Sequence, residues 1–461
     1  TKEEIGYATA AIAIEGLAEL LSQIGIPAAI VQRPVITSAH LATGFIVSIA
    51  MGLVQTAAVF MLAGPIADAL NMPAAEPVFK AISVIFALTA ISRIARTRLS
   101  RDLHFNRIAK VDLTGTVCYG VVSVVLALLG YGVWSLIAGL IVQSLVSSAL
   151  LFFGEPVPKP FRFDRGAYRD LMSVAKGFTA AAFLNYIASQ GDNLVVGRWM
   201  GAGALGVYSR SWNLMARPAV MFGQSISQVL YPTMARAQDD REQLRGLFLK
   251  STTALGIVIM PLGFVMCALA PEVVTTLLGS RWSEVIAPFQ VLAAGMFFRV
   301  GNQSSDSITR ALGDNFGRVV PKAAYALCVV GFAYLGTRVG IVGVAWGIFA
   351  ANLVHTALMT QIGLGRLEMG WSDYAKALRT PVLLTLLAGG SAWTVAEAMR
   401  RQGLSAPAIL VAALAASLVA YVLALRFGGR KLLGRDTVDL TESVGNMVGR
   451  KLRRGSRAKA A

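Results

Sequence analysis

Long apolar runs follow one another along almost the whole chain of 461 residues. A bilayer core about 30 Å thick needs about 20 apolar residues to be crossed by one helix. Measured against that length, the chain divides into thirteen expected membrane-spanning helices. They cover Ile5–Val31, Ala42–Ala67, Val78–Ile94, Val111–Leu129, Val133–Phe153, Leu171–Leu194, Leu205–Met234, Leu247–Ala270, Val285–Ala311, Val319–Leu335, Val342–Leu364, Pro381–Met399 and Ala406–Leu425. The sequence therefore predicts an all-α, polytopic membrane protein.

The composition excludes several other classes of protein. Hydrophobic residues make up 55% of the chain and charged residues 15%, whereas about 25% of residues are charged in soluble domains. A nucleic-acid-binding protein can carry a net charge of +17, but it would not also be this apolar. The three cysteines and three histidines are scattered, without metal-ligand spacing or a catalytic constellation. We therefore expect no enzymatic activity, no metal, no cofactor and no nucleic-acid partner.

The distribution of Lys and Arg gives the orientation of the expected helices. Alternate connections, together with the tail from Arg426, hold most of the 42 basic residues. Cytoplasmic loops carry such an excess, so the Arg93 to Lys110 connection and the C-terminus are expected in the cytoplasm. The first residue then lies on the opposite side, and we expect one further helix upstream, fourteen in the parent protein. The basic residues left inside the bundles are Lys176, Arg210, Arg217 and Arg299.

Short motifs of the first half of the chain recur in the second half. Phe105 and Arg107 recur as Phe316 and Arg318, and Ile5-Gly6 recurs as Leu205-Gly206. Duplicated bundles of this kind are typical of transporters, and an even number of helices between equivalents makes the repeats parallel. The expected domains are a first bundle at 1–154 that lacks its first helix, a cytoplasmic linker at 155–170, a second bundle at 171–366, two additional helices at 367–427 and a basic cytoplasmic tail at 428–461.

Several of these motifs together resemble a known family. The chain is similar to the lipopolysaccharide and colanic acid exporter family of lipid-linked oligosaccharide flippases (Wzx-type), within the multidrug, oligosaccharidyl-lipid and polysaccharide exporter superfamily. The motifs that carry the resemblance are Glu4-Ile5-Gly6-Tyr7, Gly25 to Gln32, Arg101 to Phe105, Gly132 to Leu136, Asp192 to Arg198 and Leu205 to Ser209. One departure is Gln23, which stands where relatives often carry an acid.

The resemblance implies both an architecture and a function. It implies two pseudo-symmetric six-helix bundles around a central cavity, plus two C-terminal helices. It also implies alternating-access export of undecaprenyl-pyrophosphate-linked oligosaccharide from the cytoplasmic to the outer leaflet of the bacterial inner membrane. The product would be a surface or extracellular polysaccharide. The expected partners are the lipid-linked substrate, membrane lipids, and a polysaccharide polymerase or other assembly proteins.

Polar residues inside the apolar helices fall on single helix faces. An ionised side chain that faces lipid near mid-membrane costs roughly 2.5 to 3.5 kcal/mol. These faces are therefore expected to line a hydrated cavity or to pair with one another across helices. The four faces are Glu15, Glu19 and Gln23; Asn185, Ser189 and Asp192; Arg210, Asn213, Arg217, Gln224 and Gln228; and Arg299, Asn302, Gln303, Asp306 and Arg310.

Basic and acidic faces suggest different roles. Arginine binds phosphate oxygens through bidentate hydrogen bonds and stays charged at any working pH. The predicted ligands of the pyrophosphate and sugar are Arg210, Arg217, Arg299, Asn213, Gln224 and Asn302. The predicted ligands of a proton or sodium ion whose gradient drives transport are Asp192, Glu15, Glu19 and Asp306. The alternative, that arginines and acids pair only to hold the bundle together, stays open here.

Three other functions also stay open at this point. An ion-coupled exporter of cationic drugs on the same superfamily fold would favour an acidic or aromatic cavity. A membrane-bound polysaccharide polymerase would carry a long extracytoplasmic loop with catalytic residues, and the longest such loop expected here is Pro271 to Glu284. A passive assembly scaffold would not need a polar interior.

Overall fold

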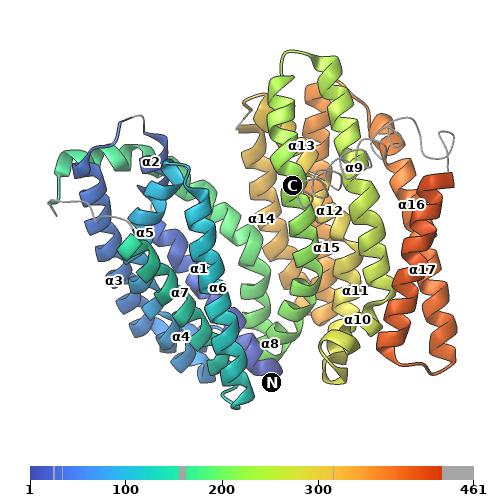
Figure 1. Ribbon diagram of the computed structural model, residues 1–461, viewed down its shortest axis with the longest axis horizontal. Helices are drawn as coiled ribbons and strands as arrows, with labels where there is room; N and C mark the ends of the chain where they lie inside the picture. Colours follow the sequence, from blue (N-terminus) through green and yellow to red (C-terminus); the bar gives the residue numbers. More distant parts are fainter. Residues whose placement is uncertain (24–25, 34, 155–161, 315, 428–461) are drawn as a thin grey trace, which may run out of the picture. The chain divides into compact units, whose positions relative to one another are not determined.

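The computed structural model describes the chain except for residues 24–25, 34, 155–161, 315 and 428–461 (Figure 1). For residues 21–23, 28, 32, 174–182, 222–229 and 316, only the backbone is described. The described residues form helices and no strands. In the first half of the chain the helices are α1 (Lys2–Gln23), α2 (Ile26–Gln32), α3 (Ser38–Ala69), α4 (Glu76–Ile82), α5 (Val84–Arg101), α6 (Phe105–Leu128), α7 (Val133–Gly154) and α8 (Arg165–Arg236).

The second half of the chain is also built from helices. They are α9 (Arg241–Ala268), α10 (Ala270–Leu277), α11 (Ile286–Ala294), α12 (Met296–Val300), α13 (Gln303–Ala311), α14 (Phe316–Thr337), α15 (Ile341–Leu367), α16 (Trp371–Arg401) and α17 (Ala406–Phe427). Two short 3-10 turns, Pro73–Ala75 and Ser280–Val285, precede α4 and α11. The predicted all-α class is confirmed.

Within the described part of the chain, nine helices are long and apolar enough to cross a membrane. Each overlaps one of the expected spans, so the polytopic membrane architecture is confirmed. A tenth expected span, Val285–Ala311, is a pair of helices, Ser280–Ala294 and Met296–Ala311, bent by 55°. The remaining three lie partly outside the fully described residues, so these spans and the count of thirteen stay predictions: Ile5–Val31, Leu171–Leu194 and Leu205–Met234.

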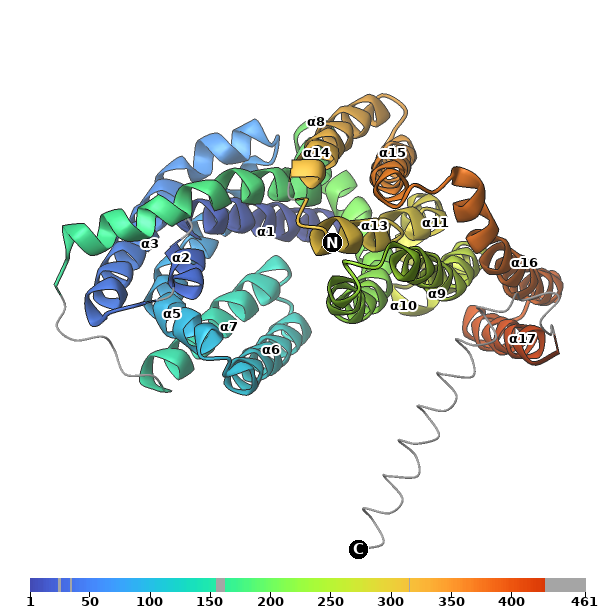
Figure 2. The ribbon, with the colours of Figure 1, turned by 90° about the horizontal axis from the view of Figure 1, so that it is seen from above.

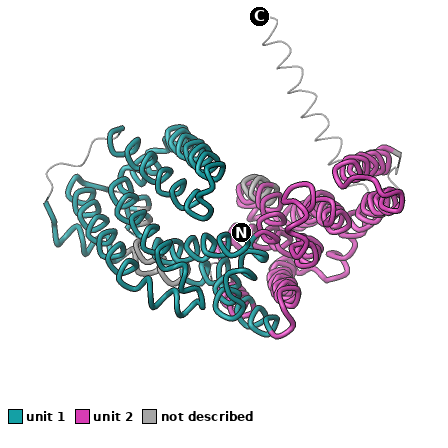
Figure 3. Tube along the Cα trace, turned by 90° about the horizontal axis from the view of Figure 1, so that it is seen from below, with its two compact units in different colours: residues 1–209, 329–337 teal, residues 210–328, 338–461 magenta. Residues whose placement is uncertain are grey.

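Contacts divide the chain into two compact units, residues 1–209 with 329–337 and residues 210–328 with 338–461 (Figure 3). This division falls after Ser209 rather than in the expected linker, because the first part of α8 packs against α1. One such contact is the hydrogen bond that the Tyr186 hydroxyl donates to the Ala13 carbonyl. The domain limits expected from the sequence stay a prediction. Residues 155–161 of the expected linker and the expected tail lie outside the described residues.

A glycine contact allows α1 and α8 to cross closely in the first unit. A Cβ atom on Gly6 would lie 2.0 Å from the carbonyl oxygen of Ala202, and one on Gly206 would lie 2.0 Å from the carbonyl oxygen of Lys2. Real side chains cannot occupy those positions, so only glycine permits this approach. Gly6 and Gly206 are also the residues that the internal sequence repeat makes equivalent.

Helix α5 is longer than the apolar run that predicts it. The run ends near Ile94, but the helix continues to Arg101. Basic residues favour the last turn of a helix because they interact with its negative end, and Arg101 also donates a 2.7 Å hydrogen bond to the Arg33 carbonyl. Arg93 and Arg96 are therefore helical residues. Helix α5 lies beside α7, which in turn packs along α6 (Figure 2).

In the second unit, one buried ion pair joins the C-terminal helices to the rest of the bundle. Glu272 on α10 is 3% exposed, and it accepts hydrogen bonds from Arg400 Nε and Nη2 at 2.7 and 2.8 Å. Arg400 also donates to the Ala268 carbonyl at 3.1 Å. Helix α16 packs along α9, and α17 packs along α16. The ion pair thus fixes the end of α16 to the turn between α9 and α10.

Candidate functional site

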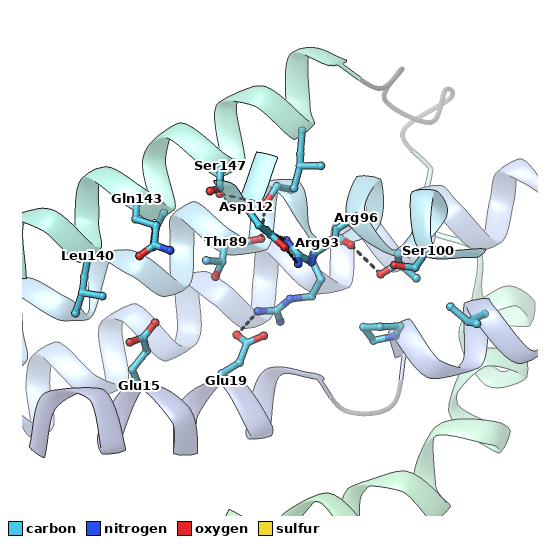
Figure 4. A pocket seen from close by; sticks show the side chains of 17 residues that line it. Glu15, Glu19, Thr89, Arg93, Arg96, Ser100, Asp112, Leu140, Gln143 and Ser147 are labelled. Atoms are coloured by element: carbon cyan, nitrogen blue, oxygen red, sulfur yellow. Dashed lines mark hydrogen bonds and ion pairs between the residues drawn. The ribbon is translucent and has the colours of Figure 1, made fainter. Parts of the chain in front are cut away.

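A polar cavity of about 700 Å³ lies inside the first unit, lined by residues of α1, α2, α5, α6 and α7 (Figure 4). The residues from α5 and from α7 follow the same spacing of three and four, which places each set on one helix face. Helix α1 adds two carboxylates and α6 adds one. The α5 set is Thr89, Ser92, Arg93, Arg96, Thr97 and Ser100, and the α7 set is Leu140, Gln143, Ser144, Ser147, Ser148 and Leu151.

Two ion pairs cross the cavity between helices. Arg93 is 8% exposed, and its Nη2 donates a 2.6 Å hydrogen bond to Glu19 on α1. Arg96 donates two parallel hydrogen bonds, of 2.7 and 2.8 Å, to Asp112 on α6. Bidentate pairs between guanidinium and carboxylate are among the stronger polar contacts in proteins. The two pairs therefore tie α5 to α1 and to α6.

Among the described residues that line the cavity, there is one carboxylate more than there are guanidinium groups. Glu15 lies one helical turn before Glu19 and faces the same space (Figure 4). Within the described residues, the Glu15 carboxylate makes no hydrogen bond and no ion pair. A single excess carboxylate beside two arginines can attract a proton or a small cation. The hydroxyl and amide groups along α5 and α7 add donors and acceptors suited to a polyhydroxylated ligand.

The predicted substrate ligands lie in the second unit. Arg299 on α12 stacks on the ring of Trp212, with 4.2 Å from its guanidinium carbon to the ring centroid. Asn302, at the break between α12 and α13, is 2.8 Å from Nδ1 of His355. Arg217 on α8 is exposed and has no hydrogen bond or ion pair to a described residue. Two further predicted ligands, Arg210 and Asn213, lie on the same helix, and the side chain of Gln224 is outside the described residues.

The four predicted acids occupy three different places. Glu15 and Glu19 share the cavity of the first unit. Asp192 is 2% exposed and accepts a 2.6 Å hydrogen bond from the Tyr208 hydroxyl. Asp306 accepts from Arg318 Nε and Arg310 Nη2, both at 2.7 Å. The contacts of Asp192 and Asp306 favour a structural role. The Glu15 carboxylate has no such contact among the described residues, so it is available to bind a cation.

Three charged residues of the cavity were not predicted from the sequence, namely Arg93, Arg96 and Asp112. Arg93 and Arg96 stand at the end of an apolar run, a pattern that predicts a cytoplasmic connection that sets the topology. The expectation of four basic residues inside the bundles is wrong, because Arg93 is buried as well. The signal that identifies it is the continuous polar face from Thr89 to Ser100, which shows that the helix extends past Ile94.

The hydrogen bond between Tyr208 and Asp192 gives a first testable prediction. Replacing Tyr208 with Phe removes one donor from a buried carboxylate, so the free energy of unfolding should fall by about 1 to 3 kcal/mol. Thermal unfolding of the purified protein in detergent measures the change. Tyr231→Phe is the matched control, because this tyrosine is exposed and its hydroxyl has no described partner. Equal stability of both variants would show that the bond contributes nothing.

Comparison with known proteins places the chain among proteins of polysaccharide assembly. The family described as "Polysaccharide biosynthesis protein" matches residues 1–287. Lipopolysaccharide biosynthesis protein WzxC of Escherichia coli (strain K12) is 27% identical over 392 residues, which cover 83% of this chain and 79% of that protein. Succinoglycan biosynthesis transport protein ExoT of Rhizobium meliloti (strain 1021) is 26% identical over 283 residues, 61% of this chain and 57% of that protein.

A solved structure shows the same fold. The lipid II flippase MurJ, in an inward closed conformation, superposes with a TM-score of 0.73 at 12% sequence identity. The superposition covers 94% of both chains. At this identity the likeness concerns the arrangement of the helices and not the ligand.

Proposed function

The chain belongs to the polysaccharide biosynthesis protein family, and from this premise we propose that it is a flippase for undecaprenyl-pyrophosphate-linked oligosaccharide. It is a multi-pass membrane transporter of the inner membrane, not an enzyme. It moves its substrate from the cytoplasmic to the outer leaflet by alternating access, with its C-terminus in the cytoplasm. The relatives named for lipopolysaccharide biosynthesis and for succinoglycan transport support this function.

The observation that carries the proposal is the charged cavity inside the first unit. Two arginines and three carboxylates in one cavity are a costly way to hold a bundle together in lipid, since each ionised group is costly there. A substrate with a diphosphate and several hydroxyl groups needs such an interior. Guanidinium groups bind phosphate oxygens, and hydroxyl and amide side chains bind sugars. The space of about 700 Å³ is large enough for a ligand of this kind.

The second unit contributes further ligands in this proposal. Arg210, Arg217 and Arg299 bind phosphate oxygens. Arg217 is exposed on α8, and Arg299 is oriented by the face of Trp212. The amide side chains that contact sugar are Asn213, Gln224 and Asn302. Replacement of the three arginines by alanine should abolish export at unchanged membrane levels.

An ion gradient drives the return of the empty transporter in this proposal. The cation, a proton or sodium, binds at Glu15 with Glu19 nearby, because Glu15 is the cavity carboxylate without a described partner. Asp192 and Asp306 are secondary candidates, since each already accepts hydrogen bonds. Full activity of Glu15→Gln with the gradient collapsed would exclude this role for Glu15.

Depletion of the protein in its own host tests the proposed function. The expected result is accumulation of an undecaprenyl-pyrophosphate oligosaccharide that stays on the cytoplasmic face, together with loss of the polysaccharide. The leaflet is assigned, before the lipid is extracted, by the accessibility of the oligosaccharide to a glycosidase added outside the intact inner membrane. Restored export on re-expression is the control. Absence of accumulation, with sensitivity to cationic drugs instead, would favour a multidrug exporter.

A further inference from the structure

The arginines of the cavity are already paired with carboxylates. Arg93 is bonded to Glu19, and Arg96 is bonded to Asp112. With Glu15 included, the described lining of the cavity has three carboxylates and two guanidinium groups. An anion that enters therefore meets guanidinium groups whose charge is already balanced by carboxylates. An anion that binds both arginines in a bidentate way competes with the carboxylates for the N–H groups that they already occupy.

The exposed fractions of the partners show which side of each pair is closer to water. The Arg93 side chain is 7% exposed, whereas Glu19 is 37% exposed and faces the cavity. Arg96 and Asp112 are both about half exposed. A carboxylate that is already hydrated loses little when it turns from its partner into water. The guanidinium of Arg93 cannot do the same, because the loss of a carboxylate partner is costly for a buried cation.

The geometry of the two arginines suits a ligand with two adjacent anionic groups. Arg93 and Arg96 are three residues apart on one face of α5, so their side chains start about 5 to 6 Å from each other. Glu19 approaches from α1 and Asp112 from α6. Each carboxylate thus occupies one of two neighbouring anion positions, which a single diphosphate can fill together.

We propose that this cavity is an exchange site, in which a diphosphate group displaces Glu19 from Arg93 and Asp112 from Arg96. The two carboxylates take the place of the ligand in the empty protein and keep the buried guanidinium of Arg93 paired. Binding exchanges the partners of the arginines without leaving an arginine unpaired. That the diphosphate belongs to a lipid-linked oligosaccharide rests on the proposed function. The exchange itself is a property of this cavity and can be tested without the lipid.

Competition between ligand and carboxylate predicts that removing a carboxylate strengthens binding. Asp112→Asn should raise the affinity for diphosphate about two- to fivefold, the contribution of an exposed ion pair. Glu19→Gln should raise it about tenfold or more, because hydrogen bonds between charged groups contribute more at a buried partner. If the pairs instead hold the arginines in the orientation that the ligand needs, both substitutions should weaken binding.

Titration calorimetry on the full chain in nanodiscs of uncharged lipid, with inorganic pyrophosphate as the probe, tests the exchange. The control is Glu76→Gln, whose carboxylate pairs with Lys80 at 2.7 Å in the same unit but does not line the cavity. Glu19→Gln should bind pyrophosphate most tightly and Asp112→Asn less tightly. Wild type and Glu76→Gln should bind it equally and most weakly. Inorganic phosphate, with a single anionic group, should bind more weakly than pyrophosphate to all four proteins.

The outcomes separate the two proposals. Weaker binding of pyrophosphate by both variants, or no binding by any of the four proteins, overturns the exchange site even if depletion causes the lipid-linked oligosaccharide to accumulate. The expected order of affinities without such accumulation upholds the exchange site and overturns the proposed function. Asp112→Asn alters a half-exposed ion pair and should therefore fold. Its affinity for pyrophosphate tests the exchange site even if Glu19→Gln does not fold.

Discussion

Replacing Arg93 with alanine is expected to reduce transport of the lipid-linked substrate roughly 10- to 150-fold, the equivalent of one lost charge-assisted hydrogen bond of about 1.5 to 3 kcal/mol. Arg93 is the buried cation of the cavity, and its guanidinium has no substitute at that position. Export of polysaccharide by cells that carry the variant, normalised to the amount of protein in the membrane, measures the loss.

Two further variants distinguish phosphate binding from structural pairing. Arg98→Ala is the matched control, because Arg98 lies on the same helix, is half exposed, and is 3.7 Å from Asp102. Its transport should stay at the wild-type level. The double variant Arg93→Gln/Glu19→Gln removes the ion pair without leaving a charge unpaired. This double variant should fold but should not transport the substrate. If it does transport the substrate, Arg93 serves only to neutralise Glu19.

Replacing Arg400 with alanine is expected to lower the free energy of unfolding by about 3 to 5 kcal/mol. Glu272 would then be a buried carboxylate without its cation, because Arg400 supplies two of its hydrogen bonds. Since this pair joins α16 to the turn before α10, α16 and α17 should separate from the bundle first on heating. Thermal unfolding in detergent, combined with limited proteolysis of the α16–α17 region, measures both effects.

The neighbouring arginine provides the control for this prediction. Arg401 is 77% exposed and, among the residues that the structure describes, pairs only with Glu397, so Arg401→Ala should change stability by less than about 0.5 kcal/mol. The double variant Glu272→Leu/Arg400→Leu should recover most of the loss, because it removes both buried charges together. If Arg401→Ala lowers the free energy of unfolding as much as Arg400→Ala does, the buried pair of Glu272 and Arg400 is not the cause of the loss.

The sequence predicts the spans of this protein well where the chain is uniformly apolar. All nine spans confirmed among the described residues, such as Ser38–Ala69 and Ala406–Arg426, come from runs that only a bilayer-spanning helix accommodates. The bend between Ala294 and Met296 was not predicted, because the same apolar run continues through it. Hydropathy reports what surrounds a helix and not whether the helix is straight.

The candidate site was predicted only in part, for a similar reason. Glu15 and Glu19 were placed on one face from their spacing, and the structure shows both in the same cavity. Arg93 was missed because an arginine at the end of an apolar run sets topology in most proteins. Its partner Glu19 lies 74 residues away in sequence. Which acid meets which arginine depends on how the helices pack, and no local pattern encodes that.

Movement of the lipid-linked substrate in proteoliposomes tests the central claim most directly. The purified protein is reconstituted with undecaprenyl-pyrophosphate oligosaccharide labelled in one leaflet, and the label that reaches the other leaflet is counted over time. Wild type and Arg98→Ala should move the label, whereas Arg93→Ala should move it roughly 10- to 150-fold more slowly than wild type. Equal rates for wild type and Arg93→Ala, or no movement by wild type, would contradict a flippase that carries its substrate through this cavity.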